Sequence, residues 1–287
     1  LFGKAEDATI QNCNVEGKVK GYQYAGGIVG GVGVKTKILN CSFQGNVKGK
    51  GEGRGGIVGY MSGGGEVNRC YVIGTVTGYR EVGGIAGYGV GTIKNCYALA
   101  DVTAAGVEAG GIAGNAYNCT IENCYYSGDV LAKNYAGGIA GVMDSTSGSS
   151  TTIENCVSLA ESVTGSNANR IAGYINITTL TNNYAWSGTT KNDKIVSAEN
   201  AGELNGANLT YENGKLSPQF SAIFASDNSA WTFTDNGLPI LKNVGGTQSA
   251  YLPLYLTKAS FYGNGTAEIP YEIRNVNDLK LLAEKVN

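Results

Sequence analysis

The chain has 287 residues, a formal net charge of −2 and no histidine. The near-neutral charge offers no basic surface for nucleic acid, and no apolar run approaches the ~18 residues that a membrane span needs. We therefore expect neither a nucleic-acid partner nor membrane insertion. The lack of histidine excludes Ser-His-Asp and Cys-His catalytic centres and the HExxH zinc site.

A glycine motif, Gly-Gly-Ile-x-Gly, recurs down the first two thirds of the chain. Its isoleucines are Ile28, Ile57, Ile85, Ile112, Ile139 and, in a degenerate copy, Ile171. Successive isoleucines are 27 to 32 residues apart. A near-constant period of this size is typical of a solenoid, in which each repeat packs only on its neighbours.

A second recurring unit, Ile-x-Asn-Cys, precedes each clear copy of the glycine motif. After the cysteine, apolar residues alternate, as Val72 and Val76 do after Cys70. A period of two indicates a half-buried strand, so one repeat predicts three short strands separated by bends. We predict an all-β fold, a right-handed parallel β-helix with one coil of about 28 residues per repeat.

Stacked coils place equivalent side chains above one another at the ~4.8 Å strand spacing. The predicted inward columns are the isoleucines of the glycine motif, the Ile/Val residues of the second unit, a valine column and a cysteine column. The column cysteines are Cys13, Cys41, Cys70, Cys96, Cys124 and Cys156. Because their spacing exceeds the ~3.8 Å that a disulfide prefers between β-carbons, we expect buried, reduced thiols. Cys119 lies outside the column, in an expected turn, and should be more accessible.

An asparagine precedes most column cysteines, where two inward residues three apart require a bend. These residues are Asn12, Asn40, Asn95, Asn123 and Asn155. Asparagine tolerates the left-handed backbone conformation that such a bend needs. We expect an internal ladder of amides, each bonded to the next coil, with Arg69 interrupting it.

The period is lost after Gly188. Before that point, a Ser/Thr-rich insertion over residues 143–152 predicts a protruding loop. Beyond it we predict short helices over 197–204 and 217–224 with serine caps, and a hairpin joining 231–233 to 238–241. A strand at 271–273 and an amphipathic helix end the chain. The predicted divisions are residues 1–188 for the β-helix, 189–246 for a small mixed α/β region and 247–287 for a strand plus helix.

Two outward columns are the candidate functional surfaces. Tyr71, Tyr97 and Tyr125 each follow a column cysteine, so alternation places their rings outside, where flat faces suit a sugar or a protein partner. Asp101 and Asp129 share an outward position on successive coils, and two carboxylates near 5 Å suit a retaining glycosidase or a calcium ion. The alternatives are a simple covering of the sheet by the tyrosines and a solvated polar edge at the aspartates.

The glycine motif and its Ile-x-Asn-Cys partner together resemble the GLUG repeat of bacterial surface proteins and of the non-catalytic parts of some IgA peptidases. The resemblance covers roughly residues 1–188. It implies an extracellular or cell-surface location, and residues 247–287 resemble the start of a further module of the same parent chain.

We therefore expect a non-enzymatic adhesion or spacer module that binds a host or dietary glycan or protein, without a cofactor or metal. One alternative is a polysaccharide-active β-helix enzyme, a glycosidase or lyase that uses Asp101 or Asp129. The other is the non-catalytic scaffold of a larger surface peptidase.

Overall fold

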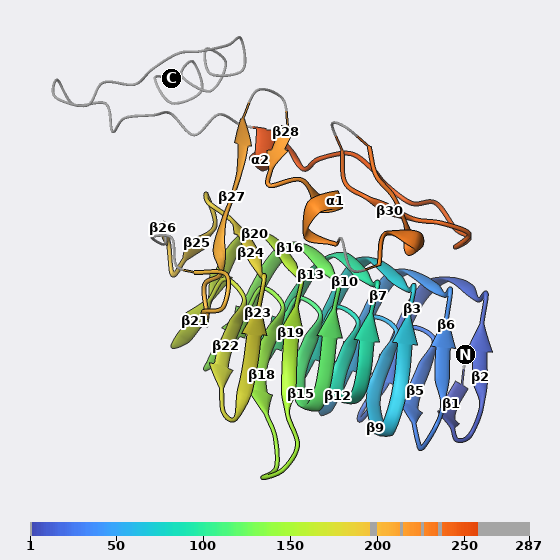
Figure 1. Ribbon diagram of the computed structural model, residues 1–287. Coiled ribbons are helices and arrows are strands. Elements are labelled where there is room, and N and C mark those ends of the chain that lie inside the picture. The colour runs from blue at the N-terminus through green and yellow to red at the C-terminus, as the bar shows by residue number, and fades with distance from the viewer. Residues whose placement is uncertain (1, 196–199, 213–214, 225–226, 235–236, 258–287) are drawn as a thin grey trace, which may run out of the picture.

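The computed structural model describes residues 2–195, 200–212, 215–224, 227–234 and 237–257. These residues form a parallel β-helix, and a C-terminal segment lies across one side of it (Figure 1). The predicted all-β solenoid is confirmed. Equivalent strands of successive coils pair in parallel within three long sheets, which we call A, B and C.

The strands of each sheet follow one another coil by coil. Sheet A contains β1 (Phe2–Ala5), β2 (Thr9–Gln11), β5 (Val29–Val32), β6 (Lys37–Leu39), β9 (Val58–Asn68), β12 (Ala86–Lys94), β15 (Ala113–Glu122), β18 (Ala140–Asp144), β19 (Thr151–Glu154), β22 (Ala172–Ile175) and β23 (Thr178–Thr181). Sheet B contains β3 (Asn14–Gly21), β7 (Ser42–Gly49), β10 (Tyr71–Gly78), β13 (Tyr97–Ala104), β16 (Tyr125–Ala132), β20 (Val157–Thr164), β24 (Tyr184–Trp186), β25 (Thr190–Lys191), β26 (Lys194–Ile195), β27 (Ala207–Glu212) and β28 (Lys215–Ser217). Sheet C contains β4 (Ala25–Gly26), β8 (Glu52–Gly55), β11 (Arg80–Gly83), β14 (Glu108–Gly110), β17 (Tyr135–Gly137) and β21 (Asn167–Asn169).

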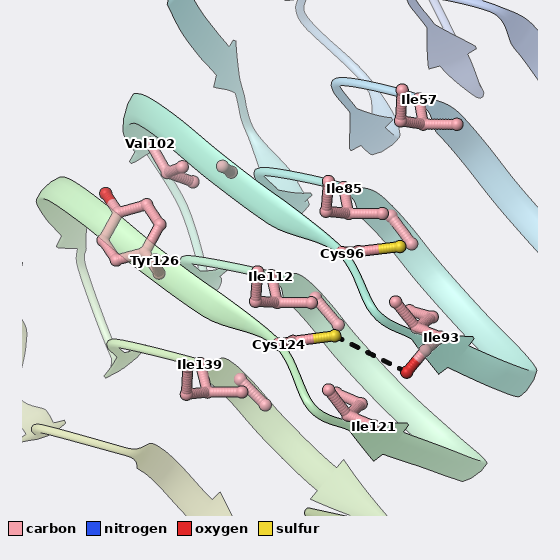
Figure 2. Close-up of a cluster of buried hydrophobic side chains, with 14 of the residues drawn as sticks. Ile57, Ile85, Ile93, Cys96, Val102, Ile112, Ile121, Cys124, Tyr126 and Ile139 are labelled. Carbon is pink, nitrogen blue, oxygen red and sulfur yellow. Dashed lines mark hydrogen bonds between the residues drawn. The ribbon is translucent and has the colours of Figure 1, made fainter. Parts of the chain in front are cut away.

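The hydrogen-bond register confirms the predicted inward columns. Ile93 of β12 pairs with Ile121 of β15, and Val76 of β10 pairs with Val102 of β13. The isoleucines of the glycine motif are all buried, and their backbones bond from coil to coil. Figure 2 shows four of them in one row beside the column cysteines. The apolar core therefore runs along the axis of the solenoid.

The paired glycines of the motif are required by the sharp bend between sheets C and A. A Cβ on Gly110 would lie 2.0 Å from the carbonyl oxygen of Ala113, and one on Gly111 would lie 2.1 Å from that of Gly138. Real Cβ atoms do not approach backbone this closely, so any larger residue would push the coils apart. The bend turns the chain into sheet A, where residues such as Tyr88 reach the outer face.

The column cysteines are free thiols, and all but the half-buried Cys13 are buried. Each later thiol donates to a carbonyl of the preceding coil, as Cys124 Sγ does to Ile93 O at 3.7 Å (Figure 2). In the next coil Asn183 takes the cysteine position. Its amide accepts from the Cys156 N–H at 3.0 Å and donates to Ile153 O at 2.9 Å, so a buried amide continues the column.

Cys119 is buried, so the expectation that it is accessible was wrong. The residue lies within β15 rather than in a turn, and its N–H donates to Thr151 Oγ1 at 3.3 Å. The register with β12 shifts between Gly89 and Gly91, which lets both Ala116 and Cys119 reach the core although they are three residues apart. Burial raises the pKa of this thiol to about 12.

The asparagine bend is confirmed, and amide bonds between successive coils occur at some positions of the expected ladder. The five asparagines and Arg69 all adopt a left-handed conformation, with φ between 50° and 56°. This conformation turns the side chain to the outer corner of the coil, where Asn12 is exposed and Asn40 half-buried, whereas Asn95, Asn123 and Asn155 are buried. Amides of successive coils bond directly where Asn182 donates to Asn155 at 2.7 Å and Asn95 donates to Asn68 at 3.3 Å. The shared feature is therefore the backbone conformation.

The insertion at 143–152 protrudes as predicted. Residues 146–150 are exposed between β18 and β19, and Figure 1 shows this loop extending beyond the neighbouring coils. Met143, at the start of the insertion, instead packs in the core.

The coils continue past residue 188. Strand β27 pairs in parallel with β24, and the N–H of Ile171 donates to Leu204 O at 2.9 Å. Sheet B therefore extends to Glu212 before β28 turns back against β27.

The C-terminal elements are shorter than predicted. Helix α1 (Phe220–Ile223) begins after Gln219, and Ser217 belongs to β28 rather than capping the helix. Residues 201–205 form turns and a bend, and 196–199 lie outside the described residues. Strands β29 (Trp231–Thr232) and β30 (Ile240–Leu241) pair as the expected hairpin, preceded by the 3-10 helix η1 (Asn228–Ala230). Helix α2 (Leu254–Thr257) follows, and the predicted strand at 271–273 with its helix lies outside the described residues.

Candidate functional site: two tyrosine rows and a buried carboxylate

The first tyrosine row is Tyr71, Tyr97 and Tyr125, on the outer face of sheet B. The rings stack coil upon coil, with centroids 5.0 and 4.8 Å apart and interplanar angles of 6°. They point away from the core as predicted, but all three are fully buried. The expectation of an exposed binding surface was wrong, because the described residues between 216 and 257, which we call the C-terminal cover, pack over the row.

The C-terminal cover contacts the first tyrosine row with both apolar and polar groups. Trp231 lies 5.8 Å from the Tyr125 ring, and Phe220 meets the same ring edge-on at 5.2 Å. Each tyrosine hydroxyl also donates to the cover, Tyr71 to Gly245 O at 3.0 Å, Tyr97 to Gln248 Oε1 at 3.1 Å and Tyr125 to Pro239 O at 2.8 Å. On this solenoid, a stacked tyrosine row thus forms a surface on which polypeptide with little regular secondary structure packs.

Asp101 and Asp129 lie exposed on the outer edge of sheet B. Asp101 Oδ1 accepts from the N–H of Asp129 at 3.1 Å, and Asp129 Oδ1 accepts from the N–H and the hydroxyl of Ser162 at 3.1 and 2.7 Å. Each carboxylate thus caps a backbone N–H of the next coil. This arrangement favours the polar-edge interpretation over a paired catalytic site. The described residues contain no cluster of three His, Cys, Asp or Glu side chains that would hold a metal.

A second tyrosine row contains Tyr60, Tyr88 and Tyr117 of sheet A and Tyr24, which directly precedes β4 of sheet C. Tyr60 and Tyr88 stack with centroids 5.1 Å apart and an interplanar angle of 12°, and Tyr24 and Tyr117 extend the row at 4.8 and 6.4 Å. Tyr24 is 39% exposed and the others are half-buried. No described segment covers this row as the C-terminal cover does the first.

Sequence reasoning missed the second row. Its signal was the tyrosine after the last glycine of the motif, at Tyr60, Tyr88 and Tyr174. Asn115 and Val142 take that position in the intervening coils, which hid the column.

Three carboxylates from sheet C adjoin the second tyrosine row. Glu52 lies on β8, Glu81 on β11 and Glu108 on β14. Arg80 links two of them, with nitrogens 3.7 Å from Glu52 Oε1 and 3.5 Å from Glu108 Oε2. Glu81 is only 9% exposed and makes no side-chain hydrogen bond or ion pair within the described part of the chain. It is therefore an unpartnered, largely buried carboxylate.

A left-handed turn positions Glu81. Glu81, Gly53 and Tyr24 all precede paired positions of sheet C and have φ of 55°, 68° and 48°. The last glycine of the next motif packs against this turn, since a Cβ on Gly114 would lie 2.4 Å from the carbonyl carbon of Glu81. The glycine motif therefore permits the close approach of the acidic turn to the tyrosine row.

The electrostatics join these residues into one site. Burial, with repulsion from Glu108, raises the pKa of Glu81 to about 7, and burial also raises the pKa of Glu108. The pKa of Tyr88 rises to about 12 through burial, the neighbouring Tyr60 and the Glu81 charge. Burial, Glu52 and Glu81 raise the pKa of Tyr24 as well. The Glu81 charge thus contributes to the raised pKa values of two tyrosines of the second row, Tyr24 and Tyr88.

The fold and the site define a repetitive β-helix with one covered and one open tyrosine row. Residues 78–103 and 105–131 match the model of the GLUG motif. The chain is thus a parallel β-helix that contains GLUG repeats.

One solved structure of similar fold is a chain from Bacteroides ovatus described as a "putative immunoglobulin A1 protease". The two chains share 24% sequence identity at a TM-score of 0.56, over 82% of this chain and 75% of that one. At this identity the likeness bears on the fold alone. No curated protein matches the chain.

Within the described residues, no helix has the length and apolar character needed to cross a membrane.

Proposed function

We propose that this protein is a non-catalytic recognition module of the bacterial cell surface, and that the second tyrosine row is its contact surface. The observation that carries the proposal is the open row beside the unpartnered Glu81. Its rings repeat from coil to coil, and repetition favours an extended contact over a single catalytic pocket. The surface location is what the resemblance to the GLUG repeat of bacterial surface proteins implies.

The ring geometry favours a polypeptide partner over a glycan. A sugar stacks on the face of an aromatic ring, but Tyr60 and Tyr88 turn their faces to each other. These two rings therefore offer their edges and hydroxyl groups. The first tyrosine row has the same stacked geometry and is covered by polypeptide, which its hydroxyls bind through backbone and side-chain oxygens.

A second candidate function is the non-catalytic scaffold of a larger surface peptidase. The observation that favours it is the similar fold of the Bacteroides ovatus chain that is described as a "putative immunoglobulin A1 protease". A scaffold of this kind would use the same open row to hold a substrate polypeptide, so both functions make the same first prediction.

Binding to arrays of secreted proteins and of glycans tests the proposal. The unmodified protein should bind one or more proteins, and Tyr60→Ser with Tyr88→Ser should weaken that binding by at least about tenfold. The matched control is Tyr251→Ser, since Tyr251 is 87% exposed in the C-terminal cover and lies outside the row. Binding that survives the double substitution would contradict the proposal.

The enzyme alternative is tested by incubation with a panel of polysaccharides. We expect no release of reducing ends or unsaturated products. Turnover that is lost in Asp101→Asn or Asp129→Asn would overturn the non-catalytic assignment.

A further inference from the structure

The carboxylates beside the second tyrosine row outnumber the cations that reach them. Glu52 and Glu108 share Arg80, and no cation of the described residues lies within ion-pair distance of Glu81. The nearby Arg54 is not available, because its buried guanidinium donates to backbone carbonyls that include those of Gly21 and Gly53. The site is therefore one positive group short.

The side chain of Glu81 is largely buried, but its carboxylate oxygens remain accessible to a ligand. Oε2 of Glu108 is fully enclosed, whereas neither oxygen of Glu81 is enclosed. A carboxylate that is nine-tenths buried yet keeps accessible oxygens has lost most of its water without gaining a protein partner. Such a group gains more from an incoming cation than a fully solvated one does.

The contacts of Arg80 show that a guanidinium group suits this acidic site. Its guanidinium lies between carboxylates of two neighbouring coils, at 3.7 Å from Glu52 and 3.5 Å from Glu108. The rings of Tyr24 and Tyr60 lie on the same flank, tilted by 49° rather than stacked, so their π-faces do not fully cover each other. Tyrosine faces and hydroxyl oxygens both attract ammonium and guanidinium groups.

We propose that Glu81, with Tyr24 and Tyr88 beside it, binds a lysine or arginine side chain of an extended polypeptide. The inference rests on the proposed function and names the charge of its partner. The excess of carboxylates calls for a positively charged group. A polypeptide is the favoured source of that group, because the stacked tyrosine row on sheet B already packs against polypeptide, with its hydroxyls bonded to the Gly245 and Pro239 carbonyls.

Titration of the full chain with short peptides tests the proposal. The probes are acetyl-Gly-Ser-Gly-Arg-Gly-Ser-Gly-amide, its Lys and Gln counterparts, and agmatine as a free alkylguanidinium. Shifts of labelled tyrosine ring resonances at pH 8 report binding. We expect the Arg and Lys peptides to bind at least tenfold more tightly than the Gln peptide, and more tightly than agmatine. Their affinity should fall with added salt.

Two variants locate the cation. Glu81→Gln keeps the shape of the side chain and should weaken the Arg peptide by about tenfold. Glu154→Gln removes an exposed carboxylate of the same solenoid, on β19, and should leave the affinity unchanged. Melting temperatures of both variants check that the fold is intact.

Three outcomes would overturn the inference. Equal affinity for the Gln peptide would exclude a charge-selective site, and agmatine binding as tightly as the Arg peptide would exclude a polypeptide source. Unchanged binding in Glu81→Gln would show that this carboxylate does not hold the cation. If array binding is lost in the tyrosine variants but not in Glu81→Gln, the proposed function survives and the cation site does not.

Discussion

The indole N–H of Trp231 donates to the side-chain oxygen of Asn95 at 3.3 Å, joining the C-terminal cover to a corner of the solenoid 136 residues earlier in the chain. The Asn95 amide in turn donates to Asp227 at 3.1 Å. Asn95, which forms the bend of its coil, is therefore also an attachment point for the C-terminal cover. This contact, with the tyrosine hydroxyls beside it, explains why the first tyrosine row is closed.

Trp231→Ala should detach part of the C-terminal cover. Trp231 is buried against Tyr97, Tyr125 and Phe224, and truncation of a buried aromatic side chain typically costs about 3–5 kcal/mol. We expect a lower unfolding midpoint and faster proteolysis of the cover, with the solenoid retained. Denaturant unfolding and limited proteolysis measure both. Tyr251→Ala, an exposed change in the same cover, should alter stability by less than about 0.5 kcal/mol. Equal effects of the two substitutions would show that Trp231 does not anchor the cover.

The thiols should react slowly in the folded protein, with Cys13 first. Cys13 is half-buried at the first coil, whereas the other cysteines, Cys119 included, are buried. Only the thiolate reacts, and burial raises the pKa values of Cys70, Cys119 and Cys124. Titration with a disulfide reagent at pH 8 should give one faster group, absent in Cys13→Ser, and all seven thiols after denaturation. A fast group that persists in Cys13→Ser would place another cysteine at the surface.

Asn183→Ala should destabilise the end of the solenoid. Its buried amide satisfies the Cys156 N–H and the Ile153 carbonyl, and each buried polar group left without a partner costs about 1–3 kcal/mol. Asn183→Cys should cost less, because a thiol fills the same position in the preceding coils and bonds in the same way. Thermal unfolding compares the two. A greater loss for the cysteine variant would contradict the equivalence of these positions.

The stability conferred by Glu81 should depend on pH in a defined direction. Its folded pKa of about 7 lies above the ordinary glutamate value of 4.5, so the folded state holds the proton more tightly. The folded state is therefore weakened as pH rises from about 4.5 through 7. The charged groups that face Glu81 are Glu52, Glu108 and Arg80, together with the hydroxyls of Tyr24 and Tyr88.

Relative to the unmodified protein, Glu81→Gln should be more stable at pH 8, by about 1–2 kcal/mol after allowance for partial solvation. The difference should shrink to near zero at pH 4. Urea unfolding at the two pH values measures it. A variant that is less stable than the unmodified protein at pH 8 would mean that the Glu81 charge stabilises the fold.

The periodic part of the structure was predictable because each coil repeats the same constraint. Ile93 and Ile121 occupy one column since their positions in the repeat are equivalent, and the bend at Asn95 follows from two inward residues three apart. The C-terminal cover was not predictable, because the contact between Asn95 and Trp231 has no period and links distant segments.

The acidic site was also beyond sequence reasoning. Glu81 and Glu108 occupy equivalent positions of successive coils, but Tyr24, Gly53 and Tyr135 stand there in the neighbouring coils, so two carboxylates alone did not mark the position. Cys119 was misplaced because a turn was expected there, whereas β15 runs on through a register shift of one residue.

The central claim is that one tyrosine row is closed and the other open, and hydroxyl-radical footprinting with mass spectrometry tests it most directly. Oxidation of each tyrosine is compared between the folded and the unfolded protein. We predict strong protection at Tyr71, Tyr97 and Tyr125 and weak protection at Tyr24 and Tyr60. Equal protection of the two rows, or stronger oxidation at Tyr97 than at Tyr24, would contradict the account.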